Sequence, residues 1–199
     1  NIFRSMMKIK NQILFIFLFY AVFNSAQNRK IDSLKKTLLV KKDTAVVNAL
    51  NAISKEFASI NPDSVLSYSK KAFQKAKAIN YSKGCARALL LEAGVFRRKG
   101  SVDSAIVIYN KVLEYPKQTD MLQEAGEADM MLGFVLQNQG EYDQSILHLI
   151  SAEKSFEKVG NKTLLGRNSW MMGNTYLKLG SYEEAEKSFS KGKMFYSRR

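Results

Sequence analysis

An internal repeat with a step of about 40 residues constrains the fold of this chain more than any other feature of its sequence. Three evenly spaced glycines, Gly100, Gly140 and Gly180, each end a helix-like pattern. Five further columns keep the same step: Phe96, Leu136 and Tyr176; Val102, Tyr142 and Tyr182; Ala105, Ser145 and Ala185; Tyr109, Leu149 and Phe189; Ala93, Gly133 and Gly173. Internal repeats of this length are typical of stacked supersecondary units, so the sequence predicts a repeat architecture.

The columns have simple physical roles in a helical hairpin. A glycine after a helix adopts the left-handed conformation that closes the helix. The small residues Ala93, Gly133 and Gly173 allow two helix backbones to approach each other, and large residues fill the remaining space. Asn61 before Pro62 marks one helix start independently of the repeat, as a cap followed by a first-turn proline.

The pattern predicts one opening helix followed by helix pairs, and it contains no strand-like alternation. We expect the opening helix over 29–41. We expect pairs over 44–59 with 62–79, 81–99 with 101–115, 118–139 with 141–158, and 162–179 with 181–195. The first pair is the weakest copy, because Asn61-Pro62-Asp63 replaces the turn glycine.

The N-terminal segment has the order of a secretory signal. A basic stretch begins at Met7, Ile13 to Phe23 is an unbroken apolar run of eleven residues, and the small residue Ala26 follows. Eleven residues rise about 16 Å as a helix, and a membrane core is about 30 Å thick, so a stable span is disfavoured. We expect cleavage after Ala26 and export to the periplasm or cell envelope. The alternative is that the segment is not cleaved and anchors the chain in the membrane, because Asn24 is larger than the small residue usually found three positions before the cleavage site.

These boundaries divide the chain into three parts. Residues 1–26 comprise upstream residues and the signal, and 27–43 form the N-terminal helix and a linker. Residues 44–199 form the repeat array, with copies at about 44–80, 81–118, 119–160 and 161–199.

Charge and composition narrow the function classes. The net charge is +13, but basic and acidic residues alternate along the chain, as in Glu153-Lys154 and Glu157-Lys158. This mixing is typical of solvated helix faces, so nucleic-acid binding is not favoured.

The reactive residue types are too few for common catalytic or metal sites. The single cysteine, Cys85, excludes an intramolecular disulfide and a Cys-based metal site, and its alanine and leucine neighbours predict a core position. His148 lies between two leucines, and no second histidine exists to complete a metal or acid–base set. We therefore expect no catalysis by this chain, no cofactor and no metal.

The last copy resembles the tetratricopeptide repeat, whose pattern is W-x2-L-G-x2-Y followed by A-x3-F. The matching positions are Ser169, Met172, Gly173, Tyr176, Ala185 and Phe189. The second copy departs from the family at Glu92, where leucine is usual, and the step of about 40 exceeds the family's commoner 34. The resemblance implies an all-α fold: a right-handed α-solenoid of about four antiparallel helix pairs with an extra N-terminal helix. In that fold the first helices line a concave surface that receives peptides or partner helices.

If the first helices face such a groove, helical spacing selects the candidate binding residues. They are Arg87, Leu90, Gly94, Arg97, Arg98, Glu127, Met130, Phe134, Asn138, Arg167, Trp170, Asn174 and Lys178. Glu127 is the one acidic residue among several basic ones, which favours an acidic ligand or a free C-terminal carboxylate. Some of these residues have an alternative, purely structural role. Met130, Phe134 and Trp170 are also suited to packing in the core. Arg97 and Arg98 are also suited to stabilising the C-terminus of their helix.

The resemblance and the missing catalytic set predict a protein-binding or peptide-binding module of the bacterial cell envelope. The alternative comes from the export signal, the opening helix and the long repeats. Together they are similar to the exported repeat regions of bacterial sensor histidine kinases and related transcription regulators. In that case a membrane helix and a signalling domain would follow Arg199. Membrane contact is expected only through an uncleaved signal or such a downstream helix.

Overall fold

The computed structural model describes residues 27, 29–38, 43–115 and 119–196 of the 199-residue chain. The predicted signal segment and its cleavage site after Ala26 lie outside these residues. Within them, no helix is both long and apolar enough to cross a membrane.

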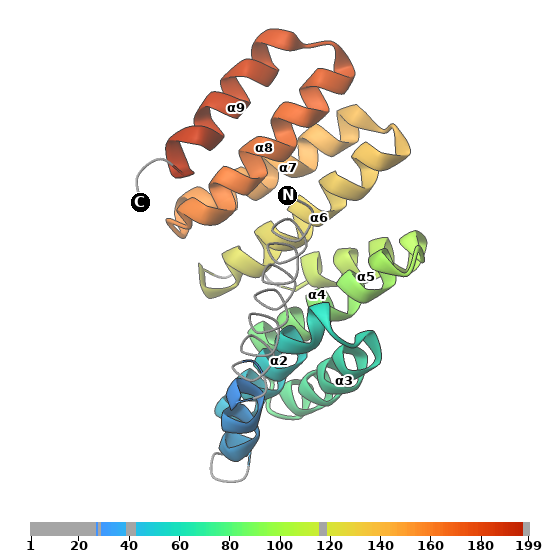
Figure 1. The fold of residues 1–199 in the computed structure, drawn as a ribbon, viewed down its shortest axis with the longest axis vertical. Helices are drawn as coiled ribbons and strands as arrows, with labels where there is room; N and C mark the ends of the chain where they lie inside the picture. Colours follow the sequence, from blue (N-terminus) through green and yellow to red (C-terminus); the bar gives the residue numbers. More distant parts are fainter. Residues whose placement is uncertain (1–26, 28, 39–42, 116–118, 197–199) are drawn as a thin grey trace, which may run out of the picture.

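The described residues form an all-α solenoid of antiparallel helix pairs, which confirms the predicted fold class (Figure 1). A helical segment covers 29–38 and precedes the pairs. The pairs are α2 (Thr44–Glu56) with α3 (Pro62–Ala78), α4 (Ser82–Arg98) with α5 (Val102–Leu113), α6 (Leu122–Gln139) with α7 (Tyr142–Lys158), and α8 (Lys162–Leu179) with α9 (Tyr182–Tyr196). Short 3-10 turns, Phe57–Ser59 and Thr119–Met121, follow α2 and precede α6.

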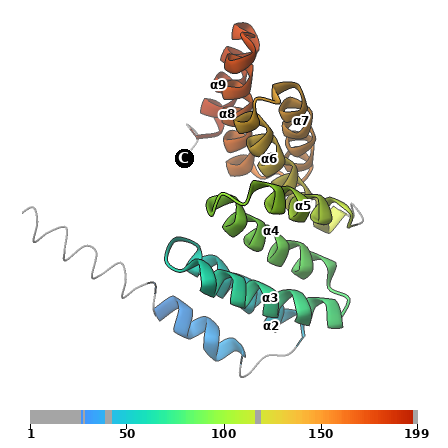
Figure 2. The same ribbon diagram turned by 90° about the vertical axis from the view of Figure 1, so that its right-hand side faces the viewer.

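The pairs are stacked in chain order along the long axis, as the turned view also shows (Figure 2). The first helices α2, α4, α6 and α8 contact one another in succession, in addition to their hairpin partners. The 29–38 segment packs on the first pair, where Ile31 is buried and Lys30 forms an ion pair with Glu56 at 2.8 Å. The first helices therefore form one continuous side of the array.

The observed helices match the predicted ranges to within a few residues, and the early end of the first of them has a local cause. The predicted helix 44–59 ends as an α-helix at Glu56 and finishes in the 3-10 turn. Asn61 is extended, with φ −146° and ψ 103°, because the ring of the following Pro62 disfavours the helical conformation before it. The Asn61 side chain accepts hydrogen bonds from two backbone N–H groups of α3, which confirms the predicted cap.

The turn glycines close their helices as predicted. Gly100, Gly140 and Gly180 have φ values of 81°, 86° and 76°. After each glycine, a backbone N–H bonds back to the carbonyl of the predicted large-residue column at 2.9 Å: Ser101 to Phe96, Glu141 to Leu136, and Ser181 to Tyr176. This is the Schellman geometry, which satisfies carbonyl groups that the helix end leaves open.

The small-residue column lets the two helices of a pair approach. An ideal Cβ at Gly133 would lie 2.7 Å from Leu149 Cγ, and one at Gly173 would lie 2.6 Å from the Phe189 ring. Ala93, in the same column, is fully buried. The repeated large residues on the second helices therefore pack directly over the small residues on the first.

The core confirms the structural interpretation of Cys85. Its thiol is buried in a cluster with Val47 and Ala76. Burial raises the pKa of the Cys85 thiol, which keeps it protonated and poorly nucleophilic at neutral pH.

Candidate functional site

The first helices α2, α4 and α6 share one open pocket of about 360 Å³. Every residue that lines it belongs to a first helix: Asn48, Asn51, Ala52, Lys55, Arg87, Leu90, Leu91, Gln123, Glu124 and Glu127. A pocket shared by successive repeats suits a ligand that runs across several hairpins.

A second cavity, of about 550 Å³, is larger than this pocket. It lies between α3, α4 and α5, and its lining includes Phe73, Ile108 and Tyr115. Beyond Tyr115 the chain continues into 116–118, which lie outside the described residues. The pocket of the first helices, whose lining is described throughout, is the candidate site.

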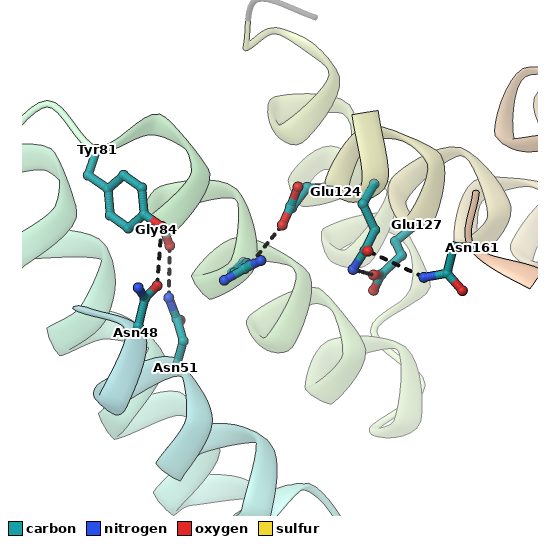
Figure 3. A network of polar contacts seen from close by, with 9 residues as sticks. Asn48, Asn51, Tyr81, Gly84, Glu124, Glu127 and Asn161 are labelled. Carbon is teal, nitrogen blue, oxygen red and sulfur yellow. Dashed lines mark hydrogen bonds and ion pairs between the residues drawn. The ribbon is translucent and has the colours of Figure 1, made fainter. Parts of the chain in front are cut away.

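A buried carboxylate forms one wall of this pocket. Glu124 is 1% exposed, and its Oε1 accepts a hydrogen bond from Arg87 Nε at 2.7 Å (Figure 3). The other oxygen, Oε2, is also buried and has no hydrogen-bond partner among the described residues. An ionised carboxylate in such a place ordinarily accepts several hydrogen bonds, so Glu124 is incompletely satisfied.

The α2 side of the pocket also has a buried side chain, an amide, that is only partly hydrogen-bonded. Asn51 on α2 is 5% exposed, and its Nδ2 donates to the Gly84 carbonyl at 3.1 Å (Figure 3). Its Oδ1 is buried and lacks a partner within the described part of the chain. Nearby, the Tyr81 hydroxyl donates to Asn48 Oδ1 at 3.2 Å. Two residues of the lining, one on α2 and one on α6, thus each carry a buried acceptor without a partner among the described residues.

A short chain of hydrogen bonds continues from the pocket to the next pair. Asn161 Nδ2 donates to Gln123 Oε1 at 3.3 Å, and Gln123 Nε2 donates to Glu127 Oε1 at 3.1 Å. Burial raises the pKa of Glu127, and the nearby Glu124 charge raises it further, against the opposing effects of Gln123, Lys55 and Arg87. The favourable effect of Lys55 and Arg87 on the ionised form of Glu127 is therefore smaller than the unfavourable effect of its burial.

The pocket brings together only part of the predicted binding set. Arg87, Leu90 and Glu127 line it. Arg97 instead lies between α4 and α6, with its guanidinium carbon 5.3 Å from the centre of the Phe134 ring. The remaining predicted residues other than Met130 are outside the lining: Gly94, Arg98, Asn138, Arg167, Trp170, Asn174 and Lys178.

The prediction that Met130 lines the groove is wrong. Met130 is 1% exposed and packs with Leu165 and Met172 of α8, because the following pair covers it. Trp170 lies one repeat step after Met130, and for this residue the alternative prediction of core packing is wrong. Its side chain is 58% exposed and contacts the Phe189 ring edge-on at 4.9 Å.

Sequence reasoning missed most of the pocket, although a signal was present. Asn48, Asn51 and Lys55 lie at helical spacing on one face of α2, and no residue of this first copy was selected. Glu124 lies one turn before the selected Glu127, on the same face of α6. Both groups therefore lie at positions that helical spacing predicts for the same side of the array.

The predicted structural role of His148 agrees with its surroundings. His148 Nδ1 lies 2.9 Å from Asp129 Oδ1, and the Ser151 hydroxyl donates to Asp129 Oδ2 at 2.6 Å. Both groups bond to the same buried carboxylate rather than to each other, so they do not form a nucleophile–base pair. The cluster ties α7 to α6.

Comparison with known proteins supports the repeat type directly at one place in the chain. Residues 167–193 match the tetratricopeptide repeat. They cover most of α8, its turn and most of α9, where the sequence pattern is clearest. No curated protein matches the chain. The helical array itself is found in solved structures, which show the fold alone at these low identities.

Two solved structures illustrate this likeness. Aspartyl phosphate phosphatase F from Bacillus subtilis is similar with a TM-score of 0.74 and 18% identity, over 88% of this chain and 46% of that one. BtubC from P. vanneervenii is similar with a TM-score of 0.66 and 14% identity, over 88% and 73% of the two chains. The present chain thus spans just under half the length of the first of these proteins.

Proposed function

We propose that this chain binds a protein or peptide segment across the pocket of α2, α4 and α6. Tetratricopeptide-type solenoids are interaction architectures, and fold alone does not name the ligand. The observation that carries the proposal is the pocket itself, which three successive first helices line and to which α2 and α6 each contribute an incompletely satisfied polar group.

The lining suits an extended peptide. Ala52, Leu90 and Leu91 provide apolar contact, while the surrounding amide and charged side chains provide hydrogen bonds at fixed positions. This combination of apolar surface and a few convergent polar groups is typical of ligand sites. The proposed function includes no catalytic activity.

A blocking substitution tests the proposal. We expect the purified 27–199 segment to bind members of a library of hexapeptides, and we expect Ala52→Trp to reduce that binding at least tenfold by filling the pocket. Ala78→Trp is the matched control, because Ala78 is an exposed residue of α3 away from the pocket. Equal binding by both variants, with thermal unfolding unchanged, would place the ligand elsewhere.

For location, we propose export to the cell envelope, on the basis of the basic, apolar and small segments between Met7 and Ala26. N-terminal sequencing of protein recovered from the envelope fraction tests this. A mature chain that begins at Gln27 supports cleavage and export. Recovery of the chain in the cytoplasm with residues 7–26 intact would contradict it.

A second candidate function is the sensory portion of a longer signalling protein. The observation that favours it is that the chain covers only 46% of the similar Bacillus phosphatase, so such arrays occur within longer chains. Reading the coding sequence beyond Arg199 separates the candidates. A membrane helix and a kinase or transcription-regulator domain would support the sensory role, and a stop codon would exclude it.

A further inference from the structure

We propose that the pocket of α2, α4 and α6 binds a positively charged side chain of its peptide ligand, an arginine or lysine, through Glu124, Asn51 and Glu127. This inference rests on the proposed function, since it names the chemistry of the ligand at that same site. It reverses the preference for an acidic ligand that the sequence alone suggests.

The first argument is the unsatisfied oxygen of Glu124. Its carboxylate is almost fully buried, yet Arg87 reaches only Oε1, through a single hydrogen bond from Nε. Oε2 retains no partner among the residues that the structure describes. The Arg87 side chain is 38% exposed and keeps its bond to Oε1, so a ligand cation at Oε2 would share this carboxylate with Arg87. Charge-assisted hydrogen bonds to such a carboxylate are among the strongest available.

The second argument is independent, because it comes from another helix. Asn51 Oδ1 on α2 is also a buried acceptor without a partner in the described ranges. A guanidinium group carries five N–H donors and an ammonium group three, whereas a backbone amide offers one. A basic side chain is therefore the ligand group best able to satisfy acceptors on more than one wall.

The charged residues of the lining are balanced, with Lys55 and Arg87 opposite Glu124 and Glu127, so the pocket as a whole does not favour an anion. The sequence-based preference for an acidic ligand relied on basic residues of α4 and α8, but of these only Arg87 lines the pocket, and it is paired with Glu124. Glu127 provides a second carboxylate, and burial raises its pKa despite the presence of Lys55. A ligand cation beside Glu127 would offset the burial of its charge.

The test uses the purified 27–199 segment and a positional-scanning library of hexapeptides with acetylated and amidated ends. We expect enrichment of arginine or lysine at one position. Replacing that arginine by citrulline, or that lysine by norleucine, should weaken binding at least about tenfold, because a charge-assisted bond is lost. Glu127→Gln and Glu124→Gln should each reduce this discrimination, whereas Glu186→Gln, at an exposed site on α9, should not. If Glu124→Gln fails to fold, Glu127→Gln and the ligand substitutions still decide the result.

The alternative outcomes separate the two proposals. The basic-ligand inference would be overturned if the peptides whose binding is lost in the Ala52→Trp variant were enriched in aspartate or glutamate, or in no residue type. The proposed function would still stand in that case. Absence of any peptide binding by the folded chain, or binding that Ala52→Trp leaves unchanged, would overturn the proposed function itself.

Discussion

Adding one methyl group to Gly133 tests whether the small-residue column sets the spacing within a hairpin. The Cβ introduced by Gly133→Ala would lie 2.7 and 2.9 Å from Leu149 side-chain atoms and 3.1 Å from the Ser145 carbonyl oxygen. Leu149 is fully buried, so its side chain has no solvent space to move into. At this place the Ser145 hydroxyl also donates to the Gly133 carbonyl at 2.7 Å, which holds α7 close to α6.

The expected magnitude is the difference between two opposing effects. Alanine gains about 1 kcal/mol over glycine in a helix interior. Restoring ordinary carbon–carbon contact requires Leu149 to move by about 0.8 Å, and overpacking of this kind costs about 1–3 kcal/mol. We therefore expect Gly133→Ala to lower the free energy of unfolding by up to about 2 kcal/mol.

Gly94→Ala is the matched control on α4. The nearest atom to its added Cβ, outside the helix's own nearby backbone, is Arg98 Nη1 at 3.5 Å, an ordinary contact. Only the helix-propensity gain remains, so we expect stabilisation by about 0.5–1 kcal/mol. The two identical substitutions should thus have opposite signs.

The free energy of unfolding of both variants is measured in urea. Unfolding is monitored by circular dichroism and by the fluorescence of the single tryptophan, Trp170. Repeat arrays can unfold in parts, so a free energy is taken only where the two probes coincide. Equal stabilisation of both variants would refute the close approach of α6 and α7 and the role assigned to the column.

Three further predictions concern a cap, a buried cluster and a pH dependence. Asn61→Ala should lower the free energy of unfolding by about 1 kcal/mol in thermal melts, because the start of α3 loses its side-chain cap. His148→Ala should lower it by about 1–3 kcal/mol in urea, because buried Asp129 loses its hydrogen bond to His148. An effect below about 0.5 kcal/mol, the usual limit for surface substitutions, would contradict this. Because the pKa of Glu127 is raised in the fold, its ionisation destabilises the protein progressively as pH rises from the ordinary pKa of a glutamate through the raised one. Glu127→Gln should therefore gain stability relative to the unsubstituted chain between pH 4 and 7 in urea unfolding, and a constant difference would count against the burial of this charge.

The hairpins could be predicted from the sequence because their determinants lie within one repeat. Gly100, Gly140 and Gly180 satisfy a local backbone requirement, and Gly133 and Leu149 meet within a single pair. Such short-range constraints recur from copy to copy and are therefore visible as columns.

The binding surface could be predicted only in part, because it depends on contacts between pairs. Met130 and Trp170 occupy the same column, yet they are 1% and 58% exposed, since cover comes from a neighbouring element. Glu124 reads as an ordinary surface charge in sequence, but packing of α6 against α4 buries it beside Arg87. Periodicity gives the face of a helix and not the depth at which each residue lies.

Hydrogen–deuterium exchange tests the central claim, that ligands bind across the first helices, most directly. The chain would be measured alone and with the tightest hexapeptide from the library, and Ala52→Trp would serve as the blocked control. We expect added protection in 44–56, 82–98 and 122–139, with little change in 102–113 and 142–158, and none in the blocked variant. Protection concentrated in α5 and α7, or unchanged by Ala52→Trp, would contradict the account.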